Sequence, residues 1–359
     1  MIELIDLAHA GELDAFVRQH PCCHFMQTSA WGRVKDDWSW YGILCRDQQR
    51  RIRGSMALLG RKLRGLHCCM LYAPRGPIFD PGDLVTFRQL IGAARELACR
   101  CNAWLLRIDP MISEKDAAFC EQIRSLGFLQ NTATDYSLFQ PRMCYVLDLR
   151  GIAPQALDQQ YHRSTRYNLH LAERRDVTVT LGGEADLEDF YGLMCKTAAN
   201  SGFQPLSREY YAHFFHELRE FTRLYLARKD GVTIAAAMAV FLGNRAWYMY
   251  SASDPAARRD YPNELLQWHM QQDALAAGCD FFDFRGVEGY PVEGNPKLGL
   301  HRFKAGFSAE FHAYVGQLDD VLRPGIALLV RLYSRIRRKP KLRHRKEKAA
   351  APVPADALQ

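Results

Sequence analysis

The sequence predicts an α/β protein with two similar domains in tandem, each built on a mixed β-sheet. Two observations support this prediction. The chain has 359 residues, which is long for a single hydrophobic core. In addition, one order of elements occurs twice: three strands, a chain-breaking segment, a helix and a fourth strand. The copies run from about Tyr41 to Asp109 and from about Leu224 to Asp283, which favours two α/β domains with a ligand cleft between them.

The first copy opens with apolar segments that short, polar links separate, as in β-hairpins. The three expected strands are residues 41–45, 53–59 and 68–72. From residue 83 to residue 101 apolar side chains recur at helical spacing, which predicts a helix with one buried face. A strand is then expected at 104–108, ending at Asp109, and a helix at 114–126 follows it.

The second copy is preceded by two expected helices, at residues 184–200 and 210–220. Its three strands are expected at residues 224–228, 232–241 and 245–251. A helix at 263–277 and a strand at 279–285 complete it, so its order repeats that of the first copy.

Further segments connect and extend the two copies. A strand at 141–149 and a helix from about residue 154 are expected between them, and a last strand at 311–318. The chain would then divide into an N-terminal domain, a C-terminal domain, a basic amphipathic helix that packs back on the first domain, and a basic, disordered tail. The expected limits of these four parts are 1–146, 147–318, 319–338 and 339–359.

Composition and charge are those of a soluble globular protein, with 48% apolar and 24% charged residues. No run of about eighteen apolar residues marks a spanning helix. Acidic residues follow Met1 where a signal peptide would be basic, so a cytoplasmic protein is expected. The net charge is +7, and basic residues gather most densely in the C-terminal tail. Such clusters suit phosphate-bearing partners, and we expect the tail to contact the anionic inner face of the plasma membrane; a solvated surface is the alternative.

The eleven cysteines indicate neither a metal site nor a disulfide framework. They occur as neighbours, such as Cys22-Cys23 and Cys68-Cys69, or singly, with no Cys-x-x-Cys pair. Zinc sites usually space their ligands by two to four residues, so no metal site is expected. In a reducing cytoplasm these residues should be free thiols.

Glycines bracket a lysine near the end of the chain, in the stretch Gly-Leu-His-Arg-Phe-Lys-Ala-Gly-Phe at residues 299–307. Glycine lets the backbone bend tightly or approach a ligand closely. A lysine at position 304, held by Phe303, would offer a fixed positive charge where a substrate oxygen becomes negative. The alternative is an exposed lysine on a late strand.

Six short motifs together carry a resemblance to a known family. They are Gln-Thr-Ser-Ala-Trp-Gly-Arg-Val-Lys at 27–35, Tyr-Ala-Pro-Arg-Gly-Pro at 72–77, Arg-Ile-Asp-Pro at 107–110, Tyr-Met-Tyr-Ser-Ala-Ser at 248–253, Asp-Phe-Arg-Gly-Val at 283–287, and the stretch at 299–307. In this order they resemble the Fem family of peptidoglycan-bridge aminoacyltransferases, which includes FemA, FemB and FemX. The resemblance covers about residues 25–318.

The resemblance implies two acetyltransferase-like (GNAT-type) domains and an aminoacyltransferase. It implies transfer of glycine, alanine or serine from aminoacyl-tRNA to the stem peptide of a peptidoglycan precursor, during formation of the interpeptide bridge. The precursor is lipid II or its nucleotide-linked form, UDP-MurNAc-pentapeptide. No cofactor is implied beyond aminoacyl-tRNA, the co-substrate. FemA and FemB carry a long helical arm, and because no long heptad segment occurs here the chain is similar to the shorter FemX-like form.

The resemblance also assigns candidate catalytic residues. Lys304 matches the family lysine that would stabilise the oxyanion formed when an amine attacks the aminoacyl ester. Phe303 would position Lys304. Asp109 lies where the family has an acid that could orient the attacking amine or accept its proton. An Asp-Pro at a strand end is otherwise often only a turn.

Three further residues are candidates for substrate binding. Lys35 matches a family lysine that meets the phosphates of the precursor, and Arg208 lies about where a partner arginine belongs. A pyrophosphate is negatively charged, so cationic side chains held in place suit its binding. Tyr250 lies where the family has a tyrosine that lines the substrate site. Without the resemblance, Lys35 and Arg208 would be surface residues and Tyr250 a core aromatic of a strand.

Two other functions stay open. One is an acyl-CoA-dependent N-acyltransferase of the same fold, acting in cell-envelope or polysaccharide synthesis. Such enzymes hold the CoA pyrophosphate with a glycine-rich loop at the start of a helix. The nearest stretch, residues 51–56, lacks the last small residue and runs into an expected strand. The other function is a basic scaffold that holds tRNA or membrane near other machinery.

Overall fold

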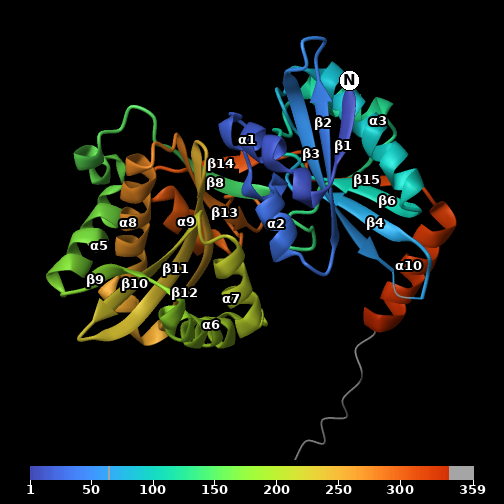
Figure 1. Ribbon diagram of the computed structural model, residues 1–359. Coiled ribbons are helices and arrows are strands. Elements are labelled where there is room, and N and C mark those ends of the chain that lie inside the picture. The colour runs from blue at the N-terminus through green and yellow to red at the C-terminus, as the bar shows by residue number, and fades with distance from the viewer. Residues whose placement is uncertain (64, 339–359) are drawn as a thin grey trace, which may run out of the picture.

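The computed structural model describes residues 1–63 and 65–338, which form two lobes side by side, each with its own β-sheet (Figure 1). Helices cover the sheets, and both sheets mix parallel and antiparallel strands. The predicted α/β class with two mixed sheets is therefore confirmed. Among the described residues the longest helix, α3 (Leu84–Arg100), has 17 residues, so this part of the chain contains no long helical arm.

The first lobe is built on an eight-stranded sheet. Its strands, in spatial order, are β1 (Ile2–Ile5), β2 (Ser39–Arg46), β3 (Ile52–Lys62), β4 (Cys69–Ala73), β6 (Ala103–Ile108), β15 (Gln317–Val321) and β7 (Leu129–Asn131), and the short β5 (Ile78–Phe79) pairs with β3. Neighbouring strands are antiparallel except β4 and β6, which run parallel. A parallel pair needs a crossover connection, and α3 supplies it.

The helices of the first lobe form where their sequence provides caps and an apolar face. The carboxylate of Asp83 accepts a hydrogen bond from the main-chain N–H of Thr86 and so begins α3. Asp116 caps α4 (Ala117–Ser125) in the same way, which explains why this helix begins three residues later than expected. Both helices bury their apolar faces in one core with the sheet.

The second lobe repeats this order on a seven-stranded sheet. Its strands, in spatial order, are β14 (Glu310–Ala313), β8 (Met143–Asp148), β13 (Phe281–Val287), β12 (Arg245–Ser253), β11 (Val232–Leu242), β10 (Thr222–Lys229) and β9 (Thr178–Gly182). The antiparallel meander β10–β11–β12 precedes α8 (Pro262–Ala276), which crosses over to β13, parallel to β12. The repeat expected from the sequence is therefore present in both lobes.

Helices cover both faces of the second sheet. On one face α8 packs beside α5 (Arg163–Arg174), and on the other lie α6 (Leu187–Ser201) and α7 (Arg208–Glu217). The helix expected from about residue 154 is shorter than predicted. Residues 154–156 and 158–160 form 3₁₀ turns, and the regular helix starts only at Arg163.

The two lobes share a hydrophobic core. The helices α1 (Gly11–Gln19) and α2 (Ser29–Val34) of the first lobe pack against the second sheet and its helices. The ring of Trp31 meets that of Phe214 edge-on, with centroids 6.4 Å apart, and Phe25 meets Trp247 at 5.1 Å. Fully buried aromatic side chains each contribute about 1.5–3 kcal/mol, so this shared core fixes the lobes relative to each other.

The last two strands lie in different sheets, although one strand was expected at 311–318. The chain turns at Gly316, which has φ +89° and no room for a side chain, because a Cβ atom there would lie 2.5 Å from the main-chain oxygen of Asn131. Consequently β14 pairs with β8 in the second sheet and β15 returns between β6 and β7 in the first. The limits expected at residues 146 and 318 thus fall inside β8 and β15.

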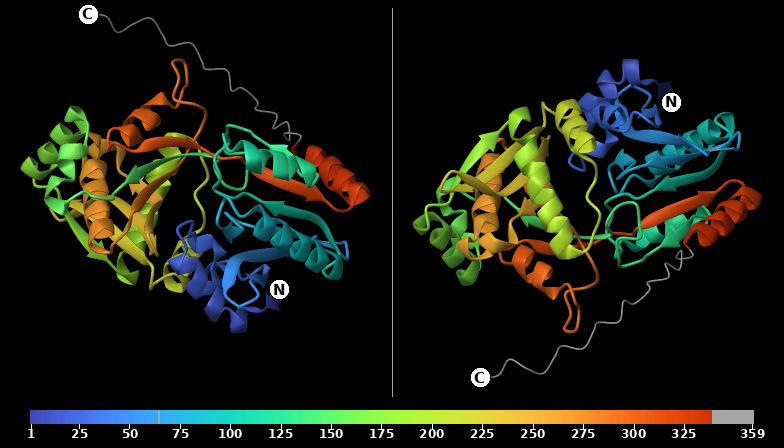
Figure 2. Two further views of the ribbon diagram at one scale, coloured as in Figure 1. Left: turned by 90° about the horizontal axis from the view of Figure 1, so that it is seen from above. Right: turned by 90° about the horizontal axis from the view of Figure 1, so that it is seen from below.

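The helix α10 (Pro324–Arg338) follows β15 and lies against β6, at the end of the first lobe remote from the second lobe (Figure 2). Ala327 is buried, whereas Leu328, Leu329 and Leu332 are exposed. No helix among residues 1–63 and 65–338 is long and apolar enough to cross a bilayer. The tail expected at 339–359 lies outside the described residues.

Candidate active site

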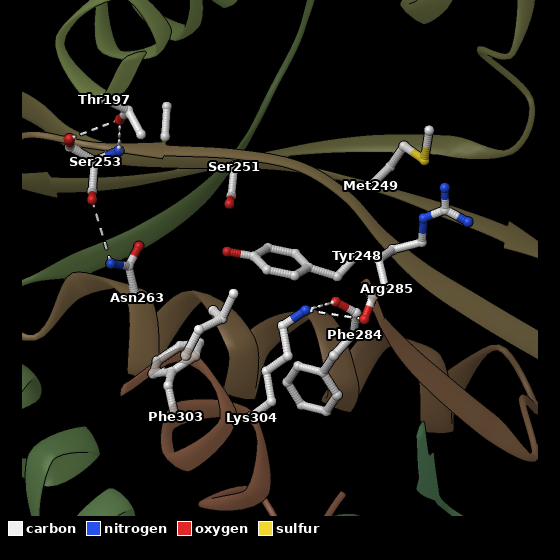
Figure 3. Close-up of a pocket in the computed structure, with 12 residues that line it drawn as sticks. Thr197, Tyr248, Met249, Ser251, Ser253, Asn263, Phe284, Arg285, Phe303 and Lys304 are labelled. Atoms are coloured by element: carbon white, nitrogen blue, oxygen red, sulfur yellow. Dashed lines mark hydrogen bonds between the residues drawn. The ribbon is translucent and has the colours of Figure 1, made fainter. Parts of the chain in front are cut away.

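A pocket of about 410 Å³ opens in the second lobe, where the edges of β12 and β13 meet the helix α9 (Leu298–Ala305) (Figure 3). Its walls combine hydroxyl and amide groups with aromatic rings and two cations. The lining residues are Thr197, Tyr248, Met249, Ser251, Ala252, Ser253, Asn263, Phe284, Arg285, Leu300, Phe303 and Lys304. Such a mixture of apolar walls and a few polar groups is typical of small-molecule sites.

Lys304 is a buried residue of α9, so the alternative of an exposed lysine on a late strand is wrong. Its Nζ atom donates hydrogen bonds to the main-chain oxygens of Phe284, Arg285 and Gly286, at 2.7, 3.0 and 2.7 Å. An ammonium group has three hydrogens, and these three carbonyls accept all of them. The side chain is therefore held in one place at the wall of the pocket.

A bulge in β13 makes the three carbonyls converge. The pairing of β13 with β8 shifts between Asp283 and Gly286, and Arg285 between them has φ +63°. The carboxylate of Asp283 accepts a hydrogen bond of 2.7 Å from the main-chain N–H of Arg285 and so supports this turn. Gly286 is required next, because a Cβ atom there would lie 2.3 Å from the ring of Pro141.

The environment of Lys304 shifts its protonation. Burial is the main cause that lowers the pKa of Lys304 from 10.5 to about 7, while the charge of Asp283 opposes this shift and the charge of Arg285 adds to it. The three carbonyl acceptors favour the ammonium form, which alone can satisfy them all. The result is a lysine that titrates near neutral pH beside a pocket, as catalytic groups often do.

Phe303 also lines the pocket and packs edge-on against Phe307, with centroids 5.2 Å apart. Phe307 in turn contacts Phe284 and the ring of Tyr161. This aromatic cluster anchors the end of α9 on the sheet. The predicted neighbours Phe303 and Lys304 therefore lie together in the pocket, and the packing of Phe303 restrains the helix that carries Lys304.

Lys35 and Tyr250 are brought together through a residue that the sequence did not single out. The Nζ atom of Lys35 donates to the hydroxyl of Tyr210 at 3.0 Å and lies over its ring, 4.5 Å from the centroid. The hydroxyls of Tyr210 and Tyr250 are 3.3 Å apart. Lys35 comes from the first lobe and both tyrosines come from the second. Tyr250 itself is half-buried beside the pocket, between the lining residues Met249 and Ser251.

Arg208 lies at the start of α7 with its side chain 56% exposed. Its Nε atom pairs with a carboxylate oxygen of Glu188 at 2.6 Å. The structure records no contact between Arg208 and Lys35 or the pocket. For Arg208 to bind phosphate as predicted, the phosphate would have to replace Glu188 as its partner.

Asp109 follows β6 in the first lobe and is buried. Its carboxylate accepts hydrogen bonds from the hydroxyl of Tyr72 at 2.7 Å and from the main-chain N–H of Arg75 at 2.6 Å. Burial raises the pKa of Asp109, while the charge of Arg75 opposes this shift. The structure places Asp109 outside the lining of the pocket that contains Lys304.

The sequence interpretation missed several residues of the site. Tyr248, Ser251 and Asn263 line the pocket, and Tyr210 links Lys35 to Tyr250. Tyr248, Ser251 and Arg285 lie in two of the six motifs, at 248–253 and 283–287, but no function was predicted for them. A signal for Arg285 existed, since an Arg-Gly pair occurs both there and at Arg75. Tyr210 and Asn263 lie on ordinary helices, where spacing alone gives no hint of function.

The described part of the chain offers no obvious metal centre. Within residues 1–63 and 65–338, no three His, Cys, Asp or Glu side chains are placed to share an ion. The eleven cysteines are free thiols. The polar groups of the pocket are hydroxyls, an amide, a guanidinium and an ammonium, which suit hydrogen bonding to a substrate.

The repeated sheet topology, with a pocket against the parallel strands of the second lobe, defines a tandem GNAT-like fold. A tandem GNAT protein from the clavulanic acid biosynthesis pathway superposes with a TM-score of 0.54 at 13% identity, over 89% of this chain and 98% of that one. A crystal structure of FemX superposes with a TM-score of 0.83 at 21% identity, over 91% of this chain and 99% of that one. These likenesses establish the fold.

Sequence comparison then gives the family. The sequence profile of the FemAB family matches residues 9–230 and 213–333, and the chain belongs to this family. The lipid II:glycine glycyltransferase of Staphylococcus saprophyticus subsp. saprophyticus is 25% identical over 89% of this chain and 92% of that protein. The family and the transferase class expected from the six motifs are confirmed.

Proposed function

We propose that this protein is a tRNA-dependent aminoacyltransferase that adds an amino acid to the stem peptide of a peptidoglycan precursor. Membership of the FemAB family and the glycyltransferase relatives support bridge formation with glycine as the first candidate, followed by alanine and serine. The observation that carries the proposal is Lys304, a buried lysine held at the wall of a pocket with a pKa near 7.

The proposed reaction is aminolysis of an ester. The free amine of the stem peptide attacks the carbonyl carbon of the aminoacyl ester and forms a C–N bond. The C–O bond to the terminal ribose then breaks, the amine loses a proton, and the ribose oxygen gains one. Nothing is oxidised or reduced in this reaction, so no cofactor is needed besides aminoacyl-tRNA as co-substrate.

Lys304 stabilises the tetrahedral oxyanion in this proposal. Its positive charge already lies at the pocket wall, and the cluster around Phe303 restrains its position. To donate to the oxyanion, Nζ exchanges one of its three carbonyl acceptors for the substrate oxygen. Removing one such preorganised donor typically costs about a hundred- to a thousandfold in rate.

The precursor would occupy the seam between the lobes. Lys35 provides a cation there, and Tyr210 and Tyr250 connect it to the wall of the pocket. Lys35 suits a pyrophosphate, which both lipid II and a nucleotide-linked precursor carry. Arg208 can join it only after leaving Glu188, an exposed ion pair that is weak.

Asp109 is the candidate acceptor for the proton of the attacking amine. Its raised pKa brings the carboxylate closer to neutral pH, where a general base is most effective. In the structure each of its oxygens accepts one hydrogen bond, from Tyr72 or from Arg75, and the carboxylate is buried. Asp109 therefore acts in this way only when the substrate amine reaches this buried carboxylate.

A lipid-linked precursor requires the protein to work at the membrane surface, on its cytoplasmic side. The helix α10 exposes Leu328, Leu329 and Leu332, and the sequence around and beyond it is rich in lysine and arginine. Exposed leucines beside basic residues suit an anionic bilayer surface. We therefore include peripheral membrane contact through α10 and the basic tail in the proposal.

The alternative function, an acyl-CoA-dependent N-acyltransferase, has less support. Residues 51–56 lead into β3, where main-chain groups pair with neighbouring strands. A Cβ atom on Gly54 would lie 2.7 Å from Thr86 of α3, so no phosphate can approach the backbone at this point. Gly54 instead allows β3 and α3 to pack closely against each other.

A biochemical test separates the candidates. The purified protein is incubated with a lipid II analogue and either charged tRNA or acetyl-CoA, and the product is identified by mass spectrometry. The proposal predicts one added aminoacyl residue on the stem peptide with charged tRNA. Acetylation from acetyl-CoA without transfer from tRNA would refute it. Muropeptide masses from cells with and without the gene would identify the amino acid and its position.

A further inference from the structure

Arg75 and Arg285 share an uncommon backbone conformation at the seam between the lobes. Arg75 has φ +58° and Arg285 has φ +63°, and a glycine follows each of them. In this left-handed region the Cβ atom of an ordinary residue crowds the next carbonyl oxygen, which is why glycine is usual there. A residue other than glycine with such a φ stores backbone strain, and where its side chain also belongs to a buried polar cluster beside a pocket it is a candidate for a functional role.

The two guanidinium groups are held at neighbouring points of one segment. Arg285 donates to the side-chain oxygen of Gln140 at 3.0 Å, and Arg75 donates to the main-chain oxygen of Pro141 at 2.6 Å. Burial is the main cause that lowers the pKa of Arg285, and the charge of nearby Arg75 lowers it as well. Two like charges are thus placed together, one from each lobe.

Their positive charges are not neutralised by ion pairs. Among the described residues, no carboxylate oxygen lies within 4 Å of either guanidinium group. Two neighbouring acids, Asp109 and Asp283, accept hydrogen bonds from the main-chain N–H groups of Arg75 and Arg285. The Nε atom of buried Arg75 has no hydrogen-bond partner among these residues.

The surroundings add further positive charge. Arg245 forms a long ion pair with Asp283, its Nη1 atom lying 3.9 Å from a carboxylate oxygen, and its Nε and Nη1 atoms have no hydrogen-bond partner in the described chain. Buried polar groups are normally paired, and unpaired ones call for an explanation. A negatively charged ligand would supply the missing acceptors.

The position of Arg285 connects this cluster to the pocket. Its main-chain oxygen binds Lys304, while its side chain extends along the wall beside Met249 (Figure 3). An anion held by the guanidinium would therefore belong to a molecule that also reaches Lys304. Guanidinium groups match the planar, two-oxygen geometry of carboxylates and bind phosphates in a similar way.

We propose that Arg285, supported by Arg75, binds an oxyanion of a substrate and thereby orients it toward Lys304. The inference rests on the proposed function. Two substrate groups have this chemistry: a carboxylate of the stem peptide, and a phosphate of the acceptor end of the RNA. The first would make Arg285 a specificity residue for stem peptides whose side-chain or α-carboxylates are free rather than amidated.

Calorimetric binding to three probes tests the inference and identifies the source of the anion. The probes are a short-chain lipid II analogue with free stem carboxylates, the same analogue with these carboxylates amidated, and an RNA microhelix carrying glycine through a stable amide. If the stem peptide supplies the anion, the native protein should bind the free-acid analogue about tenfold more tightly than the amide, the usual effect of one charge-assisted contact. Arg285→Gln should abolish this preference.

The RNA arm decides between the two sources. If the microhelix loses about tenfold in affinity on Arg285→Gln while the preference among stem peptides is unchanged, the anion is an RNA phosphate. If both the preference among stem peptides and the RNA affinity survive the substitution, the inference is overturned. These are binding measurements, so a protein that binds in this way but transfers no amino acid would overturn the proposed function and leave this inference intact.

A second variant at the same position controls for loss of binding that is caused by misfolding. Arg285→Gly removes the guanidinium and suits the left-handed backbone, so its melting temperature should equal or exceed that of the native protein while anion binding is lost. Arg50→Gly is the matched control, because Arg50 also has a left-handed φ, +64°, but is exposed on a hairpin of the first lobe. It should leave all three affinities unchanged. Unchanged binding in a well-folded Arg285→Gly protein would contradict the inference.

Discussion

The Nζ atom of Lys35, in the first lobe, lies 3.0 Å from the hydroxyl oxygen of Tyr210, in the second. The same hydroxyl lies 3.3 Å from that of Tyr250 on β12. Among the described residues, no carboxylate comes within ion-pair distance of Lys35. A cation is therefore fixed at the seam by neutral groups, so its charge is available to a ligand.

We expect Lys35→Met to weaken binding of the precursor. A hydrogen bond to a charged group contributes about 1.5–3 kcal/mol, so KM for a lipid II analogue should rise by roughly ten- to a hundredfold. The value of kcat should change little, because Lys35 does not reach the pocket of Lys304. Steady-state kinetics would show this pattern.

The control for this prediction is Lys115→Met. Lys115 is exposed beside α4 in the first lobe, and its replacement should leave KM unaltered. A second variant, Tyr210→Phe, keeps the charge but removes the hydroxyl that positions it, so a smaller rise in KM is expected. An unchanged KM in Lys35→Met would remove Lys35 from the binding site.

The stability of the protein should depend on pH through Lys304. Burial lowers its pKa from 10.5 to about 7, so between these values the unfolded chain keeps a proton that the folded protein has released. Stability conferred by this residue therefore rises with pH above about 7, by an amount of the order of 1 kcal/mol for each pH unit. Below that pH the full cost of burying the charge is present.

Melting temperatures between about pH 6 and pH 9 measure this effect. The native protein should gain stability relative to Lys304→Met as the pH rises above neutral, whereas its difference from Lys115→Met should stay constant. If the gap between the native protein and Lys304→Met did not change with pH, the lowered pKa would be wrong.

Asp109→Asn tests the role of the buried carboxylate. The substitution turns one acceptor into a donor and so disturbs a bond to Tyr72 or Arg75, at a cost of about 1–3 kcal/mol in stability. If Asp109 accepts the proton of the amine, kcat should also fall by about a hundredfold or more. Tyr72→Phe breaks one of the same bonds but keeps the carboxylate, and it should lower kcat by much less. Equal losses in the two variants would show that Asp109 only supports the turn at Arg75.

Membrane contact through α10 is tested by flotation with vesicles. The full chain should float with vesicles that contain phosphatidylglycerol, and a chain that ends at Leu322 should not. Replacing Leu328 and Leu329 by serine should weaken flotation by about tenfold or more, since both are exposed and each would bury an apolar side chain in the bilayer. Leu181→Ser, at an exposed position on β9, is the control. Equal flotation of the full and shortened chains would exclude this role.

Much of the fold could be predicted because its signals are local. The helical spacing of apolar residues in α3 and the order of strands in both lobes follow from the pattern of apolar side chains. The separation of β14 from β15 could not be predicted, because it depends on the contact between Gly316 and Asn131, which are remote in sequence. The 3₁₀ turns before α5 have the same composition as a helix start, which explains the early limit predicted there.

The site was predictable only where a motif marked it. Phe303 and Lys304 stand between two glycines, and the structure places both in one pocket. The helix that carries them was not expected, since glycines at 299 and 306 suggested a loop or strand. Tyr210 could not be foreseen, because its role depends on the packing of α7 of one lobe against α2 of the other.

A single-turnover measurement of aminoacyl transfer with Lys304→Met tests the central claim most directly. Charged tRNA is mixed with excess enzyme and a lipid II analogue, and the first-order rate of product formation is compared with the native rate. We predict a loss of about a hundred- to a thousandfold, with binding of the analogue unchanged and Lys115→Met at the native rate. A Lys304→Met protein that is folded and transfers the amino acid within a fewfold of the native rate would contradict the account.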